Sequence, residues 1–344
     1  MRAFVEQELR PHAPEWEAAR YFPDEVFARL AERGWLGLKY GDDADWVADA
    51  VLAEEIARCG SGGLAAGIGA HIGIATPPIW KFGSDDQKER FLAPAIRGQR
   101  IAALGITEPG AGSDVAGIRT FARRVDGGYV VNGSKTYITN GVRADFVVTA
   151  VKTTEEGGHQ GLSFLIIERE MDGFEPSKKL EKLGWHASDT GELAFSDVFV
   201  PDENLLGEEN RGFYLIMANF QWERLVMALG AVTSMDVVLE RVLAADADGR
   251  WRHAVAEMTV KREAARCLTY HALRLFDAGH DAIREVTEAK LLSQRSAFEV
   301  AETAFRVLDG DLEIGRAMRD TRLGPIGGGS DEVMKEILAK QLGL

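Results

Sequence analysis

The chain has 344 residues, 46% of them hydrophobic and 27% charged, which is the composition of an ordinary globular protein with room for two or three domains. Its 40 basic residues against 54 acidic residues leave a formal net charge of −14. A charge of this sign repels the nucleic-acid backbone and anionic membrane surfaces alike. Composition therefore argues against a disordered chain and against nucleic acid or membrane as a partner.

The two cysteines, Cys59 and Cys267, are far apart and have no Cys/His spacing around them. This pattern predicts neither a disulfide framework nor a metal site, and it fits a reducing cytoplasm. The N-terminus carries charges throughout and lacks the apolar region of a signal peptide, which also favours a cytoplasmic protein. The uncharged stretch Cys59–Trp80 contains several glycines and two prolines, so we expect a buried, broken helix and not a membrane span.

Residues 1–100 have a helical pattern and are predicted to form an all-α domain. An amphipathic segment begins at Pro23 and stops at Gly34, a further helix covers Ala50–Cys59, and another covers Ser84–Ile96 with Ser84 as its N-cap.

Residues 101–207 change to a period of two, which predicts a β domain. The turn pairs Asp126–Gly127 and Asn132–Gly133 are typical of tight hairpins. We expect an antiparallel, barrel-like sheet that hides its edges, and the absence of strand–helix–strand alternation argues against a Rossmann fold. The expected strands are Phe121–Val125, Tyr129–Val131, Thr136–Ile138, Phe146–Val151, Leu162–Ile167 and Leu193–Val200.

Residues 208–344 return to long helices, as in a C-terminal four-helix bundle. The fold class is thus α+β and mainly α. The expected helices are Gly212–Ala244, Arg252–Ala278, Asp281–Leu308 and Asp331–Leu342.

The first bundle helix holds a charged pair, Glu223 and Arg224, in an otherwise uncharged stretch from Phe213 to Met235. A carboxylate on an apolar face is costly unless it is paired or its pKa rises toward neutrality, where a general base works best. Two interpretations stay open from this helix alone: a catalytic base, or a structural ion pair between the two residues.

The nine residues Ile106–Asp114, ITEPGAGSD, join the first domain to the second. Glycines and small hydroxyl residues in such a loop let backbone amides approach a ligand closely. Together with Tyr137–Gly141, Ser188–Pro201 and Glu203–Phe213, this string resembles the acyl-CoA dehydrogenase family of flavoproteins. The resemblance covers nearly the whole chain and implies the same order of helical, β and helical domains.

The resemblance implies an FAD site and an acyl-CoA site. His186 stands where an arginine is common near CoA. The residues implied at FAD are Leu104, Ile106, Thr107, Gly112, Ser113, Tyr137, Ile138, Thr139, Gly329, Ser330 and Glu332, and those implied at the substrate are Ser113, Ser188, Arg224 and Gly328.

The position of the base distinguishes branches of the family. Many members place a glutamate at the position of Gly328, where this chain has no carboxylate. Members that resemble the long-chain and isovaleryl-CoA branch carry it in a Glu-Arg-Leu run, which Glu223–Leu225 matches. The resemblance thus implies that Glu223 removes the α-proton, that FAD accepts the β-hydride, and that the Gly328 N–H stabilises the enolate oxygen. A 2,3-enoyl-CoA would leave, and an electron-transfer flavoprotein would take the electrons, as in fatty-acid β-oxidation.

Two segments that reach the FAD of a neighbouring subunit in the family are shortened here, around Ala244–Trp251 and Asp309–Glu313. We expect a homo-dimer or homo-tetramer. The alternative is a regulatory subunit that needs a partner chain to complete its FAD site, and a further one is a flavin oxidase or monooxygenase on the same fold.

Overall fold

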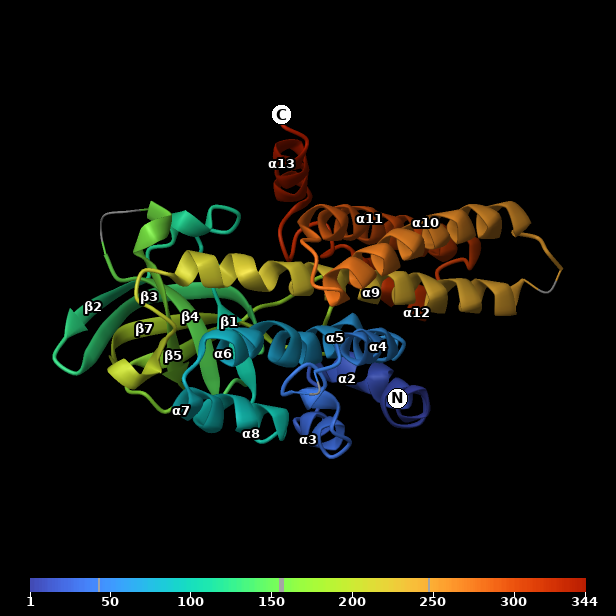
Figure 1. The fold of residues 1–344 in the computed structure, drawn as a ribbon. Helices are drawn as coiled ribbons and strands as arrows, with labels where there is room; N and C mark the ends of the chain where they lie inside the picture. Colours follow the sequence, from blue (N-terminus) through green and yellow to red (C-terminus); the bar gives the residue numbers. More distant parts are fainter. Residues whose placement is uncertain (43, 155–157, 247) are drawn as a thin grey trace.

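The computed structural model describes residues 1–42, 44–154, 158–246 and 248–344. Helices at the start of the chain, a central sheet domain and long C-terminal helices follow one another, and α9 (Gly212–Ala245) runs from beside the sheet into the bundle (Figure 1). The predicted succession of helical, β and helical parts is confirmed.

The N-terminal part consists of short helices, some of which continue through π-helical turns. Ser84 caps the third predicted helix as expected, because its Oγ accepts from the Gln87 amide at 3.2 Å. The α-helices are α1 (Arg2–Phe4), α2 (Ala13–Ala19), α3 (Glu25–Ala31), α4 (Trp46–Ala57), α5 (Gly62–Ile68), α6 (Pro77–Phe82), α7 (Asp85–Gln87) and α8 (Ala93–Ile96), and π turns cover Val5–Leu9, Gly69–Ala75 and Lys88–Leu92.

The middle domain is one sheet with the strand order β6-β7-β3-β2-β4-β5-β8, and β1 adds to β4. The expected barrel-like closure is wrong: over the described residues this path starts at β6 and stops at β8, and both β1 and β2 pair with β4 in parallel. The strands are β1 (Ala102–Gly105), β2 (Phe121–Val125), β3 (Gly128–Thr139), β4 (Phe146–Lys152), β5 (Leu162–Glu168), β6 (Phe174–Lys179), β7 (Thr190–Pro201) and β8 (Leu205–Leu206).

Of the two predicted hairpin turns, one is confirmed. Asp126–Gly127 joins β2 to β3, and Gly127 adopts a φ of 74°. Asn132–Gly133 is not a turn, since β3 runs through it opposite β7 and merely shifts register there. The long antiparallel pairing outweighs the local turn preference, and Gly133 is needed for another reason: a Cβ atom there would lie 2.6 Å from Cα of Thr120.

The C-terminal bundle contains one helix that the pattern did not predict, α12 (Leu312–Thr321). It packs against α11, and its N-cap is Asp311, whose side chain accepts from the amides of Glu313 and Ile314. The last helix, α13 (Asp331–Gln341), was expected as the fourth member of the bundle, yet it projects away from it (Figure 1). The remaining helices are α10 (Arg252–Asp277) and α11 (Ile283–Val307).

The three parts meet where α5 passes close to the middle domain. A Cβ atom at Gly63 would lie 2.7 Å from the amide nitrogen of Ala187 and 2.8 Å from that of Ser188, both of them backbone atoms. Asp320 of α12 accepts from the amides of Gly62 (3.0 Å) and Trp185 (2.6 Å), which brings the bundle to the same junction.

We expect Gly63→Ala to destabilise the protein by about 1–3 kcal/mol, because the added methyl group meets backbone that cannot move aside cheaply. The matched control is Gly69→Ala, because a Cβ atom added at Gly69 meets no atom within 4 Å apart from its own helix backbone and chain neighbours; this variant should be neutral or slightly stabilising. Chemical denaturation of both variants measures the difference. Equal stability of the two would contradict the close junction.

Candidate active site

Glu223 lies in the middle of α9 and is half-buried. Burial raises the pKa of its carboxyl group from 4.5 to about 7, and the positive charges of Arg224 and Lys290 offset part of that rise. One turn earlier, Asn219 donates from Nδ2 to the Ile74 carbonyl oxygen at 3.0 Å and so ties α9 to the N-terminal helices. The result is a carboxyl group on a fixed helix that is poised to gain or lose a proton near neutral pH.

A turn of glycines from the loop before α13 packs directly on this carboxyl group. Gly328 and Gly329 have φ values of 63° and 93°, which side chains rarely adopt. A Cβ atom at Gly328 would overlap the sulfur of Met227 and lie 3.6 Å from Oε1 of Glu223. The two places where the family resemblance puts a base therefore converge on the same space, and only one of them carries a carboxylate.

Arg224 fills the gap between α9 and the glycine turn. Its guanidinium group is 4.9 Å from the centre of the Phe220 ring, and its Nη2 would be 3.7 Å from a Cβ at Gly329. The side chain is buried, burial lowers its pKa, and its Nε finds no hydrogen-bond partner among the described residues. A cation held this way favours negative charge nearby.

Sequence reasoning missed Lys290 of α11, which reaches the same turn. Its side chain is completely buried, and its Nζ donates to the carbonyl oxygen of Gly329 at 2.6 Å. A signal was present: Lys290 shares the buried face of α11 with Val286, Ser293 and Ala297, where a lysine is out of place.

A buried ion pair between Lys135 and Glu108 anchors the ITEPGAGSD loop to the sheet, and the sequence did not predict it. Lys135 of β3 donates to Glu108 Oε1 at 2.7 Å and to the Ile106 carbonyl at 3.0 Å. Glu108 also accepts from the amides of Arg119 (2.6 Å) and Thr120 (2.9 Å). Held in this way, the loop leaves its later residues open to solvent, namely Gly110, Gly112 and Ser113.

The loop and α9 share one hydrophobic cluster. Leu104 and Ile106 pack against it, as does Phe220, which lies one turn before Glu223 and Arg224. The structure therefore connects the first residues of the predicted FAD site, Leu104 and Ile106, to the helix that carries the predicted base through one hydrophobic cluster. Thr107 is half-buried, and its carbonyl oxygen accepts from the Thr136 amide at 2.9 Å.

The side chains at the end of β3 fit a flat aromatic cofactor. Tyr137 has a φ of 59°, unusual for a residue with a side chain, and its ring is 70% exposed. Thr139 is half-buried, and Gly112 and Ser113 of the ITEPGAGSD loop are exposed, so each of these two segments offers hydroxyl or backbone donors to a ligand. Ile138 differs from its neighbours, because its side chain lies in the core of the sheet and only its backbone could meet a cofactor.

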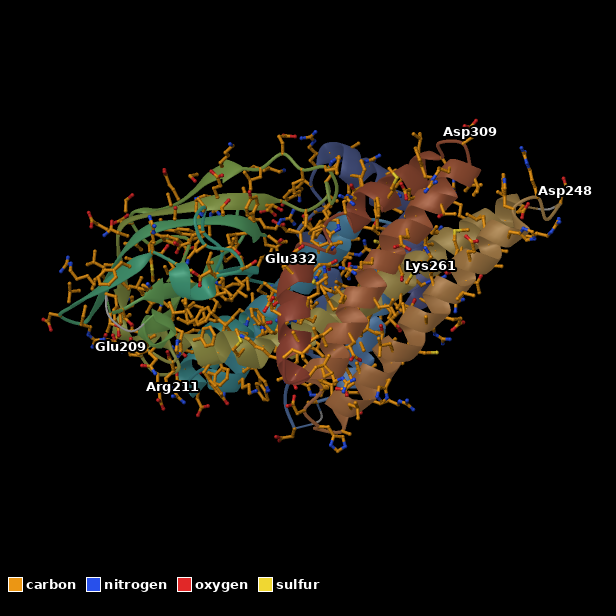
Figure 2. All side chains as sticks on the ribbon, turned by 90° about the horizontal axis from the view of Figure 1, so that it is seen from above. Glu209, Arg211, Asp248, Lys261, Asp309 and Glu332 are labelled. Atoms are coloured by element: carbon orange, nitrogen blue, oxygen red, sulfur yellow. The ribbon has the colours of Figure 1, made fainter. Side chains whose placement is uncertain are left out.

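The start of α13 offers a second polar surface, above the place where the sheet domain meets the bundle (Figures 1 and 2). Ser330 caps the helix, accepting from the Val333 amide at 3.4 Å, and Gly329 and Ser330 are half-buried. The exposed Glu332 has a pKa lowered mainly by a hydrogen bond from its own backbone amide. Since this acid already occupies the helix terminus, hydroxyl groups of a cofactor fit there better than phosphate does.

Ser188, predicted at CoA, is completely buried at the domain junction. Its Oγ accepts from Lys182 Nζ at 2.8 Å and donates to the Trp185 carbonyl at 3.0 Å. His186 is half-buried, with its Nε2 2.9 Å from the Lys182 carbonyl oxygen. The Ser188 hydroxyl is thus engaged inside the protein, and contact with CoA stays a prediction for which its placement gives no support.

Family models match the chain from end to end. The N-terminal, middle and C-terminal domains of acyl-CoA dehydrogenase match residues 1–99, 103–198 and 210–343. The chain belongs to the acyl-CoA dehydrogenase family. This membership confirms the predicted family, the fold class of helical, sheet and helical domains, and the assignment as an enzyme for FAD-dependent acyl-CoA dehydrogenation.

Individual proteins that resemble the chain are also acyl-CoA dehydrogenases. Isovaleryl-CoA dehydrogenase of Solanum tuberosum is 35% identical over 98% of this chain and 88% of its own length, and long-chain specific acyl-CoA dehydrogenase of Mus musculus is 34% identical over 99% and 84%. A probable acyl-CoA dehydrogenase from Mycobacterium abscessus has a solved structure that is 40% identical, with a TM-score of 0.95 over 99% of this chain and 96% of that one. No comparison favours the alternative of a regulatory subunit.

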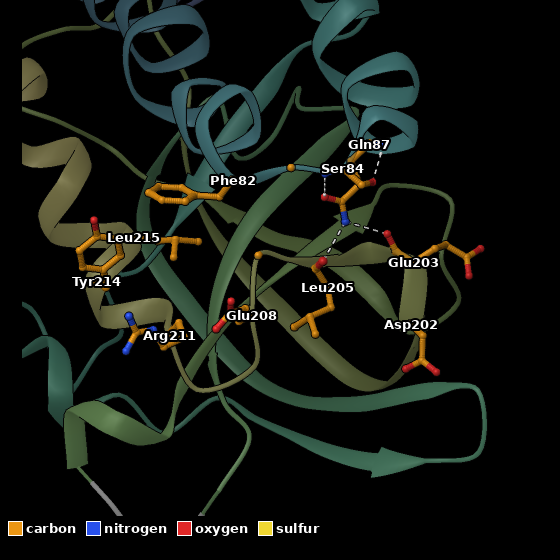
Figure 3. A pocket seen from close by; sticks show the side chains of 12 residues that line it. Phe82, Ser84, Gln87, Asp202, Glu203, Leu205, Glu208, Arg211, Tyr214 and Leu215 are labelled. Atoms are coloured by element: carbon orange, nitrogen blue, oxygen red, sulfur yellow. Dashed lines mark hydrogen bonds between the residues drawn. The ribbon is translucent and has the colours of Figure 1, made fainter.

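A cavity of about 610 Å³ lies elsewhere, between the end of α6 and the start of α9 (Figure 3). Three acidic residues line it, Asp202, Glu203 and Glu208, against one basic residue among the described lining, Arg211. This excess of negative charge repels the phosphates of CoA or FAD. None of the predicted site residues is among the described residues that line it. The site residues predicted for this acyl-CoA dehydrogenase therefore lie apart from this cavity.

The described residues hold neither a metal centre nor a membrane-spanning helix. They contain no group of three or more His, Cys, Asp or Glu side chains arranged to hold a metal ion. Within the same residues, no helix combines the length and the apolar character needed to cross a bilayer.

Proposed function

We propose that Glu223 is the base that removes the α-proton of the acyl-CoA thioester. The observation that carries this assignment is the juxtaposition of a half-buried carboxyl group, with a pKa near 7, and the vacant position at Gly328. FAD, when bound, supplies the acceptor for the β-hydride at its N5 atom. The product is a 2,3-enoyl-CoA.

The chain's own residues prepare this step in three ways. Gly328 lies beside Glu223, since a Cβ atom there would be 3.6 Å from Oε1 of Glu223, and its backbone N–H is the donor proposed to stabilise the negative charge that develops on the thioester oxygen. Arg224 supplies a positive charge that favours the ionised form of the Glu223 carboxyl group. The exposed ring of Tyr137 and the open loop at Gly112 and Ser113 receive the flat cofactor on the opposite side of the acyl chain.

The rate of flavin reduction by acyl-CoA should rise with pH and level off above about pH 7. Below that value most Glu223 is protonated and cannot accept a proton, so each pH unit lowers the rate about tenfold. Anaerobic stopped-flow bleaching of the flavin between pH 5.5 and 9 measures the profile. A rate independent of pH over this range would contradict the assignment.

The raised pKa of Glu223 should also make the stability of the protein depend on pH. Because the folded-state pKa of Glu223, about 7, exceeds the ordinary 4.5, the stability that this residue contributes is present below pH 4.5 and is lost as pH rises through 7. Glu223→Gln should therefore raise the free energy of unfolding by about 1–3 kcal/mol at pH 8 and by little at pH 4.5.

An electron-transfer flavoprotein is the proposed electron acceptor, in cytoplasmic fatty-acid β-oxidation, and a homo-dimer or homo-tetramer is the proposed assembly. Support for assembly comes from the projecting helix α13, beyond which Leu342 and Leu344 are exposed, and from the exposed Leu312. The shortened connection between α9 and α10 includes residue 247, which lies outside the described residues. Light scattering tests the assembly, and anaerobic bleaching with a panel of acyl-CoA thioesters tests the substrate class.

A further inference from the structure

We propose that Lys290 is a positioning residue for the dehydrogenation: it holds the Gly328–Gly329 turn against Glu223 by its hydrogen bond to Gly329, and its charge favours the deprotonated carboxylate. This inference rests on the proposed role of Glu223. It goes beyond that role because it assigns the preparation of the base to a side chain on a different helix.

Burying the charged group of Lys290 costs free energy. Its side chain has no exposed surface, and no carboxylate among the described residues lies within 4.0 Å of its Nζ. The nearby Asp331 forms its ion pair with Arg295 instead, at 2.6 Å. Burying an ammonium group without an ion-pair partner costs several kcal/mol, whereas a neutral glutamine could make the same single hydrogen bond to Gly329. The charge itself therefore has a use that the hydrogen bond does not explain.

The charge of Lys290 acts on the carboxyl group of Glu223. The charged groups that face Lys290 are Asp331 and Glu332 at the start of α13 and Arg224 and Glu223 on α9. Those that face Glu223 are Arg224 on its own helix and Lys290 on α11. Both cations act on Glu223 in the same direction, and together they oppose the rise in pKa that burial imposes. Lys290 is the one that also contacts the turn.

Lys290 also constrains the backbone of the glycine turn. Gly328 and Gly329 both have positive φ, and glycines are free to leave such conformations unless something holds them. The hydrogen bond from Lys290 fixes the carbonyl of Gly329 at 2.6 Å, and the next residue, Ser330, is fixed as the cap of α13. Gly328, where an added Cβ atom would lie 3.6 Å from Oε1 of Glu223, is thereby held in place before a substrate arrives.

Three substitutions separate the two roles. Lys290→Gln removes the charge and keeps a donor, Lys290→Met removes both, and Lys290→Arg keeps both in a bulkier form. Lys335→Met is the matched control, since Lys335 is an exposed lysine on α13. The FAD-loaded enzymes are compared by the pH midpoint of flavin reduction and by its limiting rate at high pH. In addition, isotope-edited infrared spectroscopy of ¹³C-glutamate-labelled protein follows the titration of Glu223, identified as the band that Glu223→Gln removes.

We expect Lys290→Gln and Lys290→Met each to raise the midpoint of the Glu223 titration by about half to one pH unit. Only Lys290→Met should also lower the limiting rate of flavin reduction, roughly tenfold. Lys290→Arg should keep the wild-type midpoint, and Lys335→Met should change neither the midpoint nor the limiting rate. An unshifted titration in both Gln and Met would overturn the electrostatic role, and an unchanged limiting rate in Met would overturn the positioning role. If Glu223→Gln kept full activity, the proposed base would fall, while the infrared titration would still decide whether Lys290 controls that carboxyl group.

Discussion

Glu223→Gln is expected to lower the rate of flavin reduction by acyl-CoA roughly 10²–10⁴-fold, the range that loss of a general base usually produces. The amide has nearly the same shape and cannot accept the α-proton. Because the side chain is half-buried beside Gly328 and Met227, the isosteric change should leave the packing and the affinity for acyl-CoA largely intact. Anaerobic stopped-flow measurements give the rate, and equilibrium binding of the enoyl-CoA product gives the affinity.

The matched control is Glu240→Gln, which lies on the same helix. Glu240 is exposed and pairs with Arg58 at 2.6 Å, a type of surface contact that contributes little to stability. Its rate should equal that of the wild type. If Glu223→Gln were reduced as fast as the wild type, the α-proton would have to leave to a different group, and the role of the glycine turn would need another explanation.

Lys135→Met is expected to destabilise the protein by about 3–5 kcal/mol and to abolish retention of FAD, because it leaves the buried Glu108 without its cation. Burial by itself would raise the pKa of Glu108, but Lys135 outweighs that effect and holds the pKa below its ordinary value. Burial also lowers the pKa of Lys135 to about 8. The lost contact is the anchor of the ITEPGAGSD loop, so stability and cofactor binding should fall together. Denaturation curves and flavin absorbance after gel filtration measure the two effects.

Two further variants test the cause. Lys178→Met removes an exposed lysine from β6 in the same sheet and should alter neither quantity. The double variant Lys135→Met with Glu108→Gln should recover part of the stability, since it removes the buried charge that the single change leaves unpaired. A single variant as stable as the wild type would mean that the pair does not anchor the loop.

Several local features followed from sequence because they depend on neighbours in the chain. The Ser84 cap, the Asp126–Gly127 turn and strand Phe121–Val125 are governed by short-range hydrogen bonds and by alternation, and all three were predicted correctly. Asn132–Gly133 obeys the same local rule but was wrong as a turn, because pairing with β7 over most of the length of β3 is stronger than the preference of two residues. The direction of α13 and the open edges of the sheet likewise depend on contacts between distant segments.

The sequence by itself determined the family, the order of the domains and the identity of Glu223 as a candidate base, because these depend on motifs and on one misplaced charge in an apolar helix. Only the tertiary structure decided what surrounds that charge. Gly328 and Lys290 come from segments far from Glu223 in the chain, and that spacing carries no information about their close approach, in which a Cβ atom added at Gly328 would lie 3.6 Å from Oε1 of Glu223. The pKa of a buried group depends on its distance to charges and on its exclusion from water, and both arise only when the helices have packed.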